Sequence, residues 1–228
     1  MRDAVNIQAV QLVAAGLSEL RGQVVFVGGA AISLYADDPG ADSPRPTSDI
    51  DLVIEAVGYG AYARLEQRLA ELGFHHTPED AINCRYRYHG VTVDIMPTDV
   101  PALMPTNRWH LPGIKHAVKA KLPDGTSLAL LTAPYFLGTK FEAHASRGGD
   151  PRTSKDFEDI VFVLDSRLRI VEEILAAPDD IRSYLKRHAK ALLQGSAGRE
   201  ALETHLAPLI AGARADVLMQ RLRAITVG

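Results

Sequence analysis

The feature that most constrains this chain is a glycine pair followed, some twenty residues later, by two aspartates inside an apolar run. Residues 24–27 are all apolar and predict a short buried strand, which Gly28 and Gly29 end before a predicted helix. Glycine has no Cβ, so such a turn accepts unusual backbone angles and the close approach of another group. Because the amides at a helix N-terminus are suited to phosphate oxygens, the turn predicts a phosphate-binding element.

The two aspartates, Asp49 and Asp51, lie in the predicted strand 49–55. Side chains at positions i and i+2 of a strand share one face, about 7 Å apart. Crowded carboxylates repel each other, and a cation between them removes that cost. Mg²⁺ is commonly held by one or two carboxylates together with substrate phosphates. An ordinary exposed strand face is the alternative, but aspartate has a poor β propensity, so the pattern favours metal-assisted nucleotide chemistry.

A third acid, Asp94, is the only acid in the alternating strand predicted at residues 91–96, after a turn at His89 and Gly90. The glycine turn, the sequence Ser48-Asp49-Ile50-Asp51 and this later acid together resemble the signature of the DNA polymerase β-type nucleotidyltransferase superfamily. That resemblance implies an α/β (α+β) fold in which a mixed sheet is flanked by helices. It also implies that the third acid lies on a strand adjacent to the first two.

Within that superfamily, the chain is most similar to the AbiEii/MenT-like nucleotidyltransferase toxins. The similarity rests on residues 137–147, which contain a lysine and an arginine, and on residues 152–160, which contain a basic-Asp-x-x-Asp pattern. It covers about residues 20 to 165. The spacing between Gly29 and Asp49 is longer than is usual in the family. The resemblance implies nucleotide-binding roles for Lys140, Arg147 and Asp159.

Periodicity elsewhere predicts a catalytic core over residues 1–133 and a mainly helical C-terminal region over 134–228 that packs on the core. We expect a strand from Phe74, a first hairpin that joins 83–89 to 91–96, an irregular segment at 97–112, and a second hairpin that joins 117–122 to 127–131. On the first hairpin Arg85 and Arg87 share one face, which is either solvated or neutralises a triphosphate. A helix is predicted from Pro134 through Ser146. Thr153 is expected to cap the next helix with Asp156 as the third-position acid, so Asp156 is either a capping or a functional residue.

The composition limits the function classes. The net charge of −3 excludes a globally basic nucleic-acid binder, although Arg182, Lys186 and Lys190 recur every fourth residue of one predicted helix. That row is either a solvated face or a track for the phosphates of a nucleic acid. A single cysteine suits a reducing compartment, and no apolar stretch approaches a membrane span. We therefore expect a cytoplasmic protein with no membrane partner.

The mechanism that the resemblance implies is nucleotidyl transfer from a nucleoside triphosphate, assisted by two Mg²⁺ ions, with Mn²⁺ as a substitute. The expected metal-binding and catalytic residues are Asp49, Asp51 and Asp94. The expected triphosphate contacts are Gly28, Gly29, Ser48, Lys140 and Arg147, with Asp159 orienting Lys140 or lining the nucleotide site.

Three function hypotheses follow from these observations. In the first, the acceptor is a macromolecular hydroxyl, at a tRNA 3′ end or on a protein, and the enzyme is the toxin of a toxin–antitoxin pair with a cognate antitoxin as partner. In the second, the enzyme modifies an aminoglycoside-like small molecule. In the third, the chain is a non-catalytic nucleotide-binding protein on the same fold.

Overall fold

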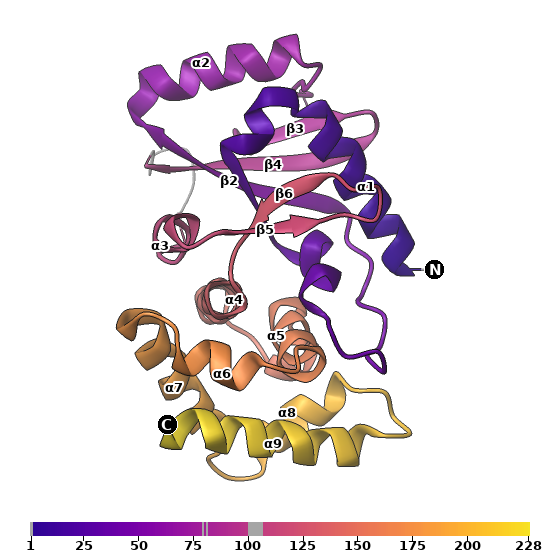
Figure 1. The fold of residues 1–228 in the computed structure, drawn as a ribbon, viewed down its shortest axis with the longest axis vertical. Coiled ribbons are helices and arrows are strands. Elements are labelled where there is room, and N and C mark those ends of the chain that lie inside the picture. The colour runs from indigo at the N-terminus through magenta and orange to yellow at the C-terminus, as the bar shows by residue number, and fades with distance from the viewer. Residues whose placement is uncertain (1, 79, 81, 100–106) are drawn as a thin grey trace. The chain divides into compact units, whose positions relative to one another are not determined.

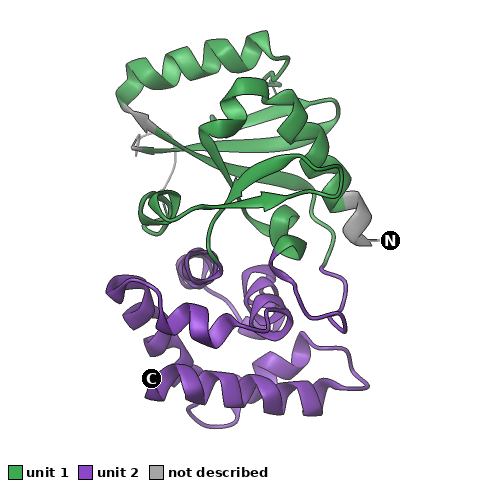
Figure 2. Ribbon diagram, in the orientation of Figure 1, with its two compact units in different colours: residues 1–34, 45–132 green, residues 35–44, 133–228 purple. Residues whose placement is uncertain are grey.

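The computed structural model describes residues 2–78, 80, 82–99 and 107–228. The chain divides into two compact units (Figure 2), of which the first comprises residues 1–34 and 45–132. The second comprises residues 35–44 and 133–228. The first unit holds the sheet, and the second is built from helices (Figure 1).

The sheet of the first unit has six strands in the order β3-β4-β2-β1-β6-β5. The strands are β1 (Val24–Val27), β2 (Asp49–Val57), β3 (Arg85–Tyr88), β4 (Val91–Asp99), β5 (Val118–Lys121) and β6 (Ser127–Leu130). Strand β2 runs parallel to β4, and β1 runs parallel to β6, whereas the other neighbours are antiparallel. The predicted fold class, a mixed sheet flanked by helices with a helical C-terminal region, is therefore confirmed.

The strands form because their apolar residues fill the centre of the first unit. All four residues of β1 are buried, and the start of β2 alternates, with Ile50 and Leu52 buried while Asp49 and Asp51 are partly exposed. The helical segments of this unit are α1 (Arg2–Gly16), η1 (Ser18–Gly22), η2 (Gly29–Tyr35), α2 (Gly58–Glu71) and α3 (His110–Lys115). Segment η2 is a 3-10 helix, and its last residue groups with the second unit.

Helices α1 and α2 contact the same face of the sheet at β3 (Figure 1). A Cβ on Gly16 of α1 would lie 2.3 Å from the ring of Tyr88, and the hydroxyl of Tyr62 on α2 lies 3.4 Å from that of Tyr86. Because side chains alternate along a strand, Arg85 points to the opposite face. The register pairs Arg85 with Asp94, so that opposite face is the one that carries the acids.

The second unit packs its helices around an apolar core. The helices are α4 (Ala133–Arg147), η3 (Pro151–Thr153), α5 (Lys155–Ser166), α6 (Ile170–Leu175), α7 (Asp179–Leu192), α8 (Ala197–Thr204) and α9 (Ala211–Val227). Fully buried side chains such as Phe136, Ile160 and Leu218 come from α4, α5 and α9. The core is therefore assembled from helices that are far apart in the sequence.

Residues 35–44 belong with the second unit because ion pairs and hydrogen bonds attach them to α5 and α9. The backbone amides of Asp37 and Asp38 both donate to the carbonyl of Ser166, at 3.1 and 3.0 Å. Arg214 of α9 then bridges Asp38, at 3.2 Å, and Asp165, at 2.7 Å. Arginines of the second unit therefore hold two acids of this connection, Arg167 at Asp37 and Arg214 at Asp38.

Several local expectations are confirmed and others are wrong. Both predicted hairpins form, and the helix predicted from Pro134 is α4. The strand predicted from Phe74 is wrong, because only His75 makes a bridge, to Arg87. The cap of α5 is Ser154 rather than Thr153, because the Ser154 hydroxyl accepts from the amide of Phe157. The segment predicted to be irregular contains the end of β4 and helix α3, and residues 100–106 lie outside the described residues.

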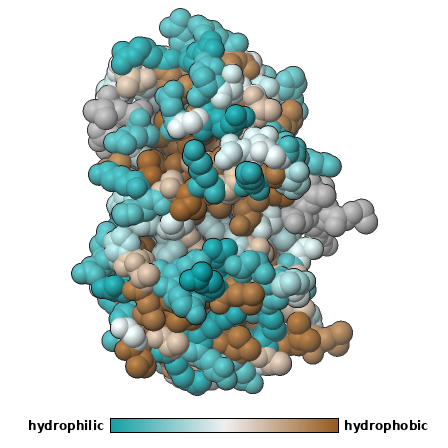
Figure 3. Space-filling view, in the orientation of Figure 1, coloured by the Kyte–Doolittle hydropathy of each residue, from teal (hydrophilic) through white to brown (hydrophobic). Residues whose placement is uncertain are grey.

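Polar and apolar side chains are mixed on the surface. Figure 3 shows one face of the molecule, on which apolar groups are interspersed among hydrophilic ones. In the described part of the chain, every helix is too short or too polar to cross a bilayer.

Candidate active site

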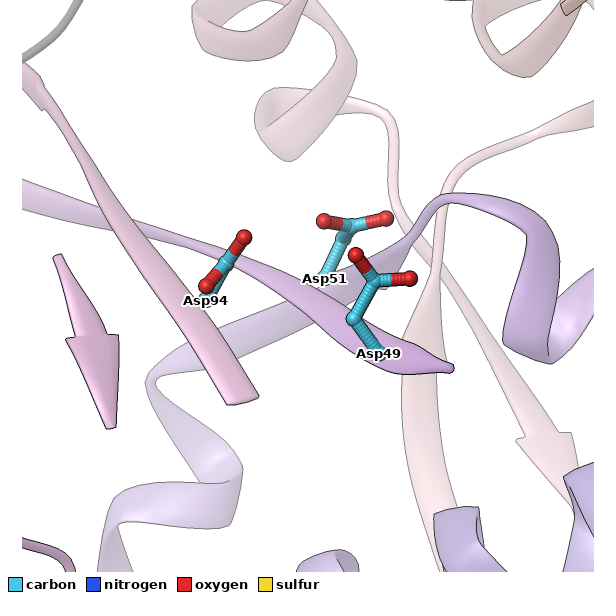
Figure 4. Close-up of side chains that lie close together, drawn as sticks. All are labelled: Asp49, Asp51 and Asp94. Carbon is cyan, nitrogen blue, oxygen red and sulfur yellow. The ribbon is translucent and has the colours of Figure 1, made fainter. Parts of the chain in front are cut away.

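Three carboxylates converge on the face of the sheet opposite α1 and α2 (Figure 4). Asp49 and Asp51 lie on β2, and the parallel register places Asp94 of β4 directly beside Asp51. Carboxylate oxygens of the three residues all lie within 4.8 Å of one another. Asp94 is 5% exposed, whereas Asp49 and Asp51 are partly exposed. Three hard oxygen donors at this separation match the ligand preference of a divalent cation such as Mg²⁺.

The glycine turn lies against one of these acids. Strand β1 pairs with β2 so that Val27 is opposite Asp51, and Gly28 follows with a φ of +72°. A Cβ on Gly28 would lie 2.0 Å from the Oδ2 atom of Asp51. Two features therefore require glycine at this position: the left-handed backbone conformation, and the carboxylate that occupies the space of a Cβ. Gly29 is buried and begins η2.

The approach to β2 is also held in place. The side-chain oxygen of Asn6 accepts from the amide of Thr47, and the amide of Asn6 donates to the carbonyl of Arg45. The Thr47 hydroxyl donates to the carbonyl of Asp49 at 3.3 Å. Ser48, which lies between them, is exposed. These bonds fix the backbone at the point where the acids begin.

Arg85 of β3 contacts two members of the acid cluster, a pairing that the sequence did not predict. Its Nε and Nη2 atoms donate to the two oxygens of Asp94 at 2.8 and 2.7 Å, and Nη2 lies 3.9 Å from an oxygen of Asp49. The hydrogen bonds to Asp94 raise the pKa of Arg85 well above its usual value. The sequence suggested a solvated face or a triphosphate contact for this arginine. The two-residue turn at His89 and Gly90 was the signal that could have revealed the pairing, since it fixes the register of the hairpin.

The predicted nucleotide-binding residues of the second unit form a cluster of their own. The ammonium of Lys140 lies 2.7 Å from Asp159 and 3.4 Å from Asp156, and its side chain is 10% exposed. Arg147 donates to the other oxygen of Asp156, and its side chain is 71% exposed. Asp156 therefore does not act as the third-position acid of a capping box. The structure brings Lys140, Arg147, Asp156 and Asp159 together across α4 and α5.

A cavity of about 490 Å³ lies elsewhere on the first unit. Its lining includes Tyr59, Tyr62 and Glu66 of α2, with His76 and Asn83 from the segment before β3. Because Tyr62 hydrogen-bonds Tyr86, this cavity lies on the α2 side of the sheet, away from the face that carries the acids. It is therefore not the candidate active site.

Comparison with known proteins identifies the family of this chain. The sequence matches the family described as nucleotidyl transferase AbiEii toxin, type IV TA system, over residues 11–224. The chain belongs to this family. It is therefore a nucleotidyltransferase, as the resemblance predicted, and its family is one of toxins of toxin–antitoxin systems. No curated protein matches the sequence significantly.

Two solved structures share the fold of this AbiEii-family chain. One is an antigenic nucleotidyltransferase-like protein from Paracoccidioides brasiliensis, with 20% identity and a TM-score of 0.53 over 96% of this chain and 92% of that chain. The other is the antibiotic-resistance factor ANT(2'')-Ia, with 15% identity and a TM-score of 0.50 over 83% of this chain and 96% of that chain. At these identities the similarity concerns the fold alone.

Proposed function

We propose that this chain transfers a nucleoside monophosphate from a nucleoside triphosphate to a hydroxyl of an RNA. The observation that carries the proposal is the convergence of Asp49, Asp51 and Asp94 beside a glycine turn that has no room for a side chain. An acid cluster can hold cations, and a turn with accessible amides can bind phosphates. The acid cluster and the glycine turn thus offer a cation site and a phosphate site on adjacent strands of one sheet, which is what nucleotidyl transfer requires.

The donor set fits divalent metal ions, which the family's chemistry implies. Asp49 and Asp51 would hold both ions, and Asp94 would complete the coordination of the one nearer the acceptor. When bound, such ions lower the pKa of the attacking hydroxyl and stabilise the charge on the leaving pyrophosphate. Mg²⁺ is the expected ion, and Mn²⁺ is the expected substitute.

The residues of the first unit then position the reactants. The acceptor oxygen bonds to the α-phosphorus, the bond from that phosphorus to the oxygen bridging to the β-phosphate breaks, and pyrophosphate leaves. The hydroxyl proton passes to Asp94 or to water. Gly28, Gly29 and Ser48 would hold the triphosphate through backbone amides and the serine hydroxyl.

The cluster of the second unit is proposed to serve the triphosphate as well. Arg147 exposes most of its side chain and can meet a β- or γ-phosphate without leaving Asp156. Lys140, our second phosphate contact, is held by Asp159 at 2.7 Å, which orients its ammonium. Lysine and arginine are both suited to the charge of a triphosphate.

The choice of RNA as acceptor rests on helix α7. Its outer face carries Lys186, Arg187 and Lys190, and the only acids of the helix, Asp179 and Asp180, lie in its first turn. Lys186 and Lys190 are one turn apart, which corresponds to a rise of about 6 Å. Beyond the first turn every charged side chain of this helix is cationic, and such a row supports contact with a phosphate backbone.

The test is to incubate the protein with each α-labelled nucleoside triphosphate, Mg²⁺, and either total RNA or total protein. We expect label in RNA, and none with Asp51→Asn. Lys186→Glu combined with Lys190→Glu should reduce RNA labelling about tenfold or more at low salt, since each contact contributes to the salt-dependent affinity. Reversing the charge of the exposed Arg223 on α9, by Arg223→Glu, is the control. Label in protein or in a small molecule would overturn the choice of RNA while preserving nucleotidyl transfer.

The family also supports a biological role as a toxin with a cognate antitoxin. Induced expression of the chain should then arrest growth, whereas the Asp51→Asn protein, expressed to the same level, should not. Co-expression of the gene product encoded beside it is expected to restore growth. Equal toxicity of both proteins would separate growth arrest from nucleotidyl transfer.

A further inference from the structure

Arg85 binds the one member of the acid cluster that is buried. Its guanidinium donates to both oxygens of Asp94, at 2.8 and 2.7 Å, and approaches Asp49 at 3.9 Å. The side chain of Arg85 is 25% exposed and that of Asp94 is 7% exposed. Two parallel charge-assisted hydrogen bonds are the strongest arrangement available to an arginine and a carboxylate. Asp94 is thus already fully engaged by a cation that belongs to the chain.

This engagement conflicts with the role of Asp94 as a metal ligand. Each carboxylate oxygen keeps a second lone pair, so a metal ion can reach Asp94, but only beside the guanidinium of Arg85 and in competition with it for the same negative charge. Arginine cannot leave by deprotonation, because its guanidinium stays charged in proteins. A divalent cation therefore binds Asp94 either against the repulsion of the Arg85 charge or by displacing Arg85, and both weaken its binding.

We propose that Arg85 is an internal counter-ion that competes with a divalent cation for Asp94. Without metal it holds the third carboxylate in place and offsets one of the three negative charges. With metal it shares or yields Asp94. Arg85 is a positioning residue, which acts on the metal through its ligand. This inference rests on the proposed metal-dependent function.

The chain supplies its own control for this proposal. Arg87 lies two residues further along β3 on the same face, and its Nε and Nη2 atoms donate to the two oxygens of Asp80 at 3.0 and 2.5 Å. Asp80 is not a member of the acid cluster. Arg87→Gln therefore removes a comparable ion pair from the same strand without altering a proposed metal ligand.

The experiment is a calorimetric or paramagnetic titration of the full chain with Mn²⁺ alone, in the absence of nucleotide. Arg85→Gln should tighten Mn²⁺ binding roughly tenfold or more, because a ligand is released and a positive charge beside it is lost. Arg87→Gln should leave the affinity within about twofold of the unsubstituted chain, since the charge it removes does not bind a metal ligand. In a chain that carries Asp94→Asn, the effect of Arg85→Gln should largely disappear, because the two residues act through one contact.

The outcomes separate this inference from the proposed function. If Arg85→Gln lowers the melting temperature but leaves Mn²⁺ affinity unchanged, Arg85 is a structural brace and the inference is overturned alone. If the unsubstituted chain and all variants fail to bind Mn²⁺, the metal-dependent function itself is overturned. Should Arg85→Gln not fold, Arg85→Lys keeps the charge and cannot hold both oxygens as a fork, so a smaller tightening is expected from it. An unchanged affinity in the lysine variant also overturns the inference.

Discussion

Replacing Lys140 by Met should destabilise the protein strongly, because the ammonium is the counter-ion of a buried carboxylate. Asp159, at 2.7 Å from the ammonium, is 1% exposed, whereas Asp156 keeps its partner Arg147. Removing one partner of a buried ion pair costs about 3–5 kcal/mol, because the remaining buried charge loses its counter-ion. For a chain of this length, that corresponds to a fall in melting temperature of roughly 6–20 °C.

The assay is unfolding followed by circular dichroism at a helical wavelength, since the second unit consists of helices. Lys140→Met combined with Asp159→Leu should recover much of the lost stability, because an apolar pair can replace a buried ion pair with little loss. Arg152→Gln is the matched control, because its partner Asp150 is exposed and lies on the same connection between α4 and α5. A loss below about 1 kcal/mol, the value expected for an exposed pair, would refute the reasoning.

The same variants decide the functional role of this cluster. Binding of a nucleoside triphosphate is measured at a temperature at which every variant is folded. If Lys140 contacts phosphate, Lys140→Met weakens triphosphate binding and the Asp159→Leu replacement does not restore it, although stability recovers. If affinity follows stability in every variant, the pair is structural, and only the acid cluster of the first unit retains a predicted role in the reaction.

Four further outcomes are expected. Asp51→Asn should lower transfer at least roughly a hundredfold while leaving the metal-free melting temperature unchanged or higher, because it relieves carboxylate repulsion; activity that persists in this variant or in a chelator contradicts the mechanism. Gly28→Ala should lower the free energy of unfolding, measured in denaturant titrations, by about 1–3 kcal/mol or more, because the methyl group strains the positive φ and meets Asp51. Hydrogen bonds from Arg87 lower the pKa of Asp80 from 3.8 to about 2, so the stability it contributes is complete above about pH 4 and is lost as the pH falls through 2; acid titration of Arg87→Gln should show a weaker dependence in that window. Burial raises the pKa of Cys84 to about 11, so its thiol should resist a disulfide reagent near pH 8 until urea is added.

The acid cluster could be predicted because its geometry is local. The alternation of β2 fixes the shared face of Asp49 and Asp51, and the resemblance placed Asp94 on an adjacent strand. Gly28 followed from the same reasoning, since a strand that ends in glycines signals a close approach. The structure adds which group approaches, namely the carboxylate of Asp51.

The remaining contacts depend on packing between distant segments. Lys140 meets Asp159, which the resemblance suggested would orient it, because α4 and α5 pack side by side after the break at residues 148–150; no periodicity within either helix reveals that pairing. The attachment of Asp38 to Arg214 likewise joins residues that are 176 positions apart. Arg85 is different, since counting back from the turn at His89 would have placed it opposite Asp94.

The two charged clusters differ in the ligand that each can accept. In the first, three carboxylates lie within 4.8 Å of one another, and the guanidinium of Arg85 offsets only one of their charges. Such a cluster favours the addition of cations, because each one reduces repulsion among the acids. In the second, the cations Lys140 and Arg147 match the carboxylates Asp156 and Asp159, so an added cation gains little there.

An anion can enter the second cluster only by sharing or replacing a carboxylate, which Arg147 permits because most of its side chain is exposed. Mg²⁺ alone should therefore raise the melting temperature by binding the first cluster. A metal-free triphosphate should raise it by binding Arg147. A response to the metal-free triphosphate that survives Arg147→Gln would place the phosphate contact at Lys140 or at the glycine turn instead.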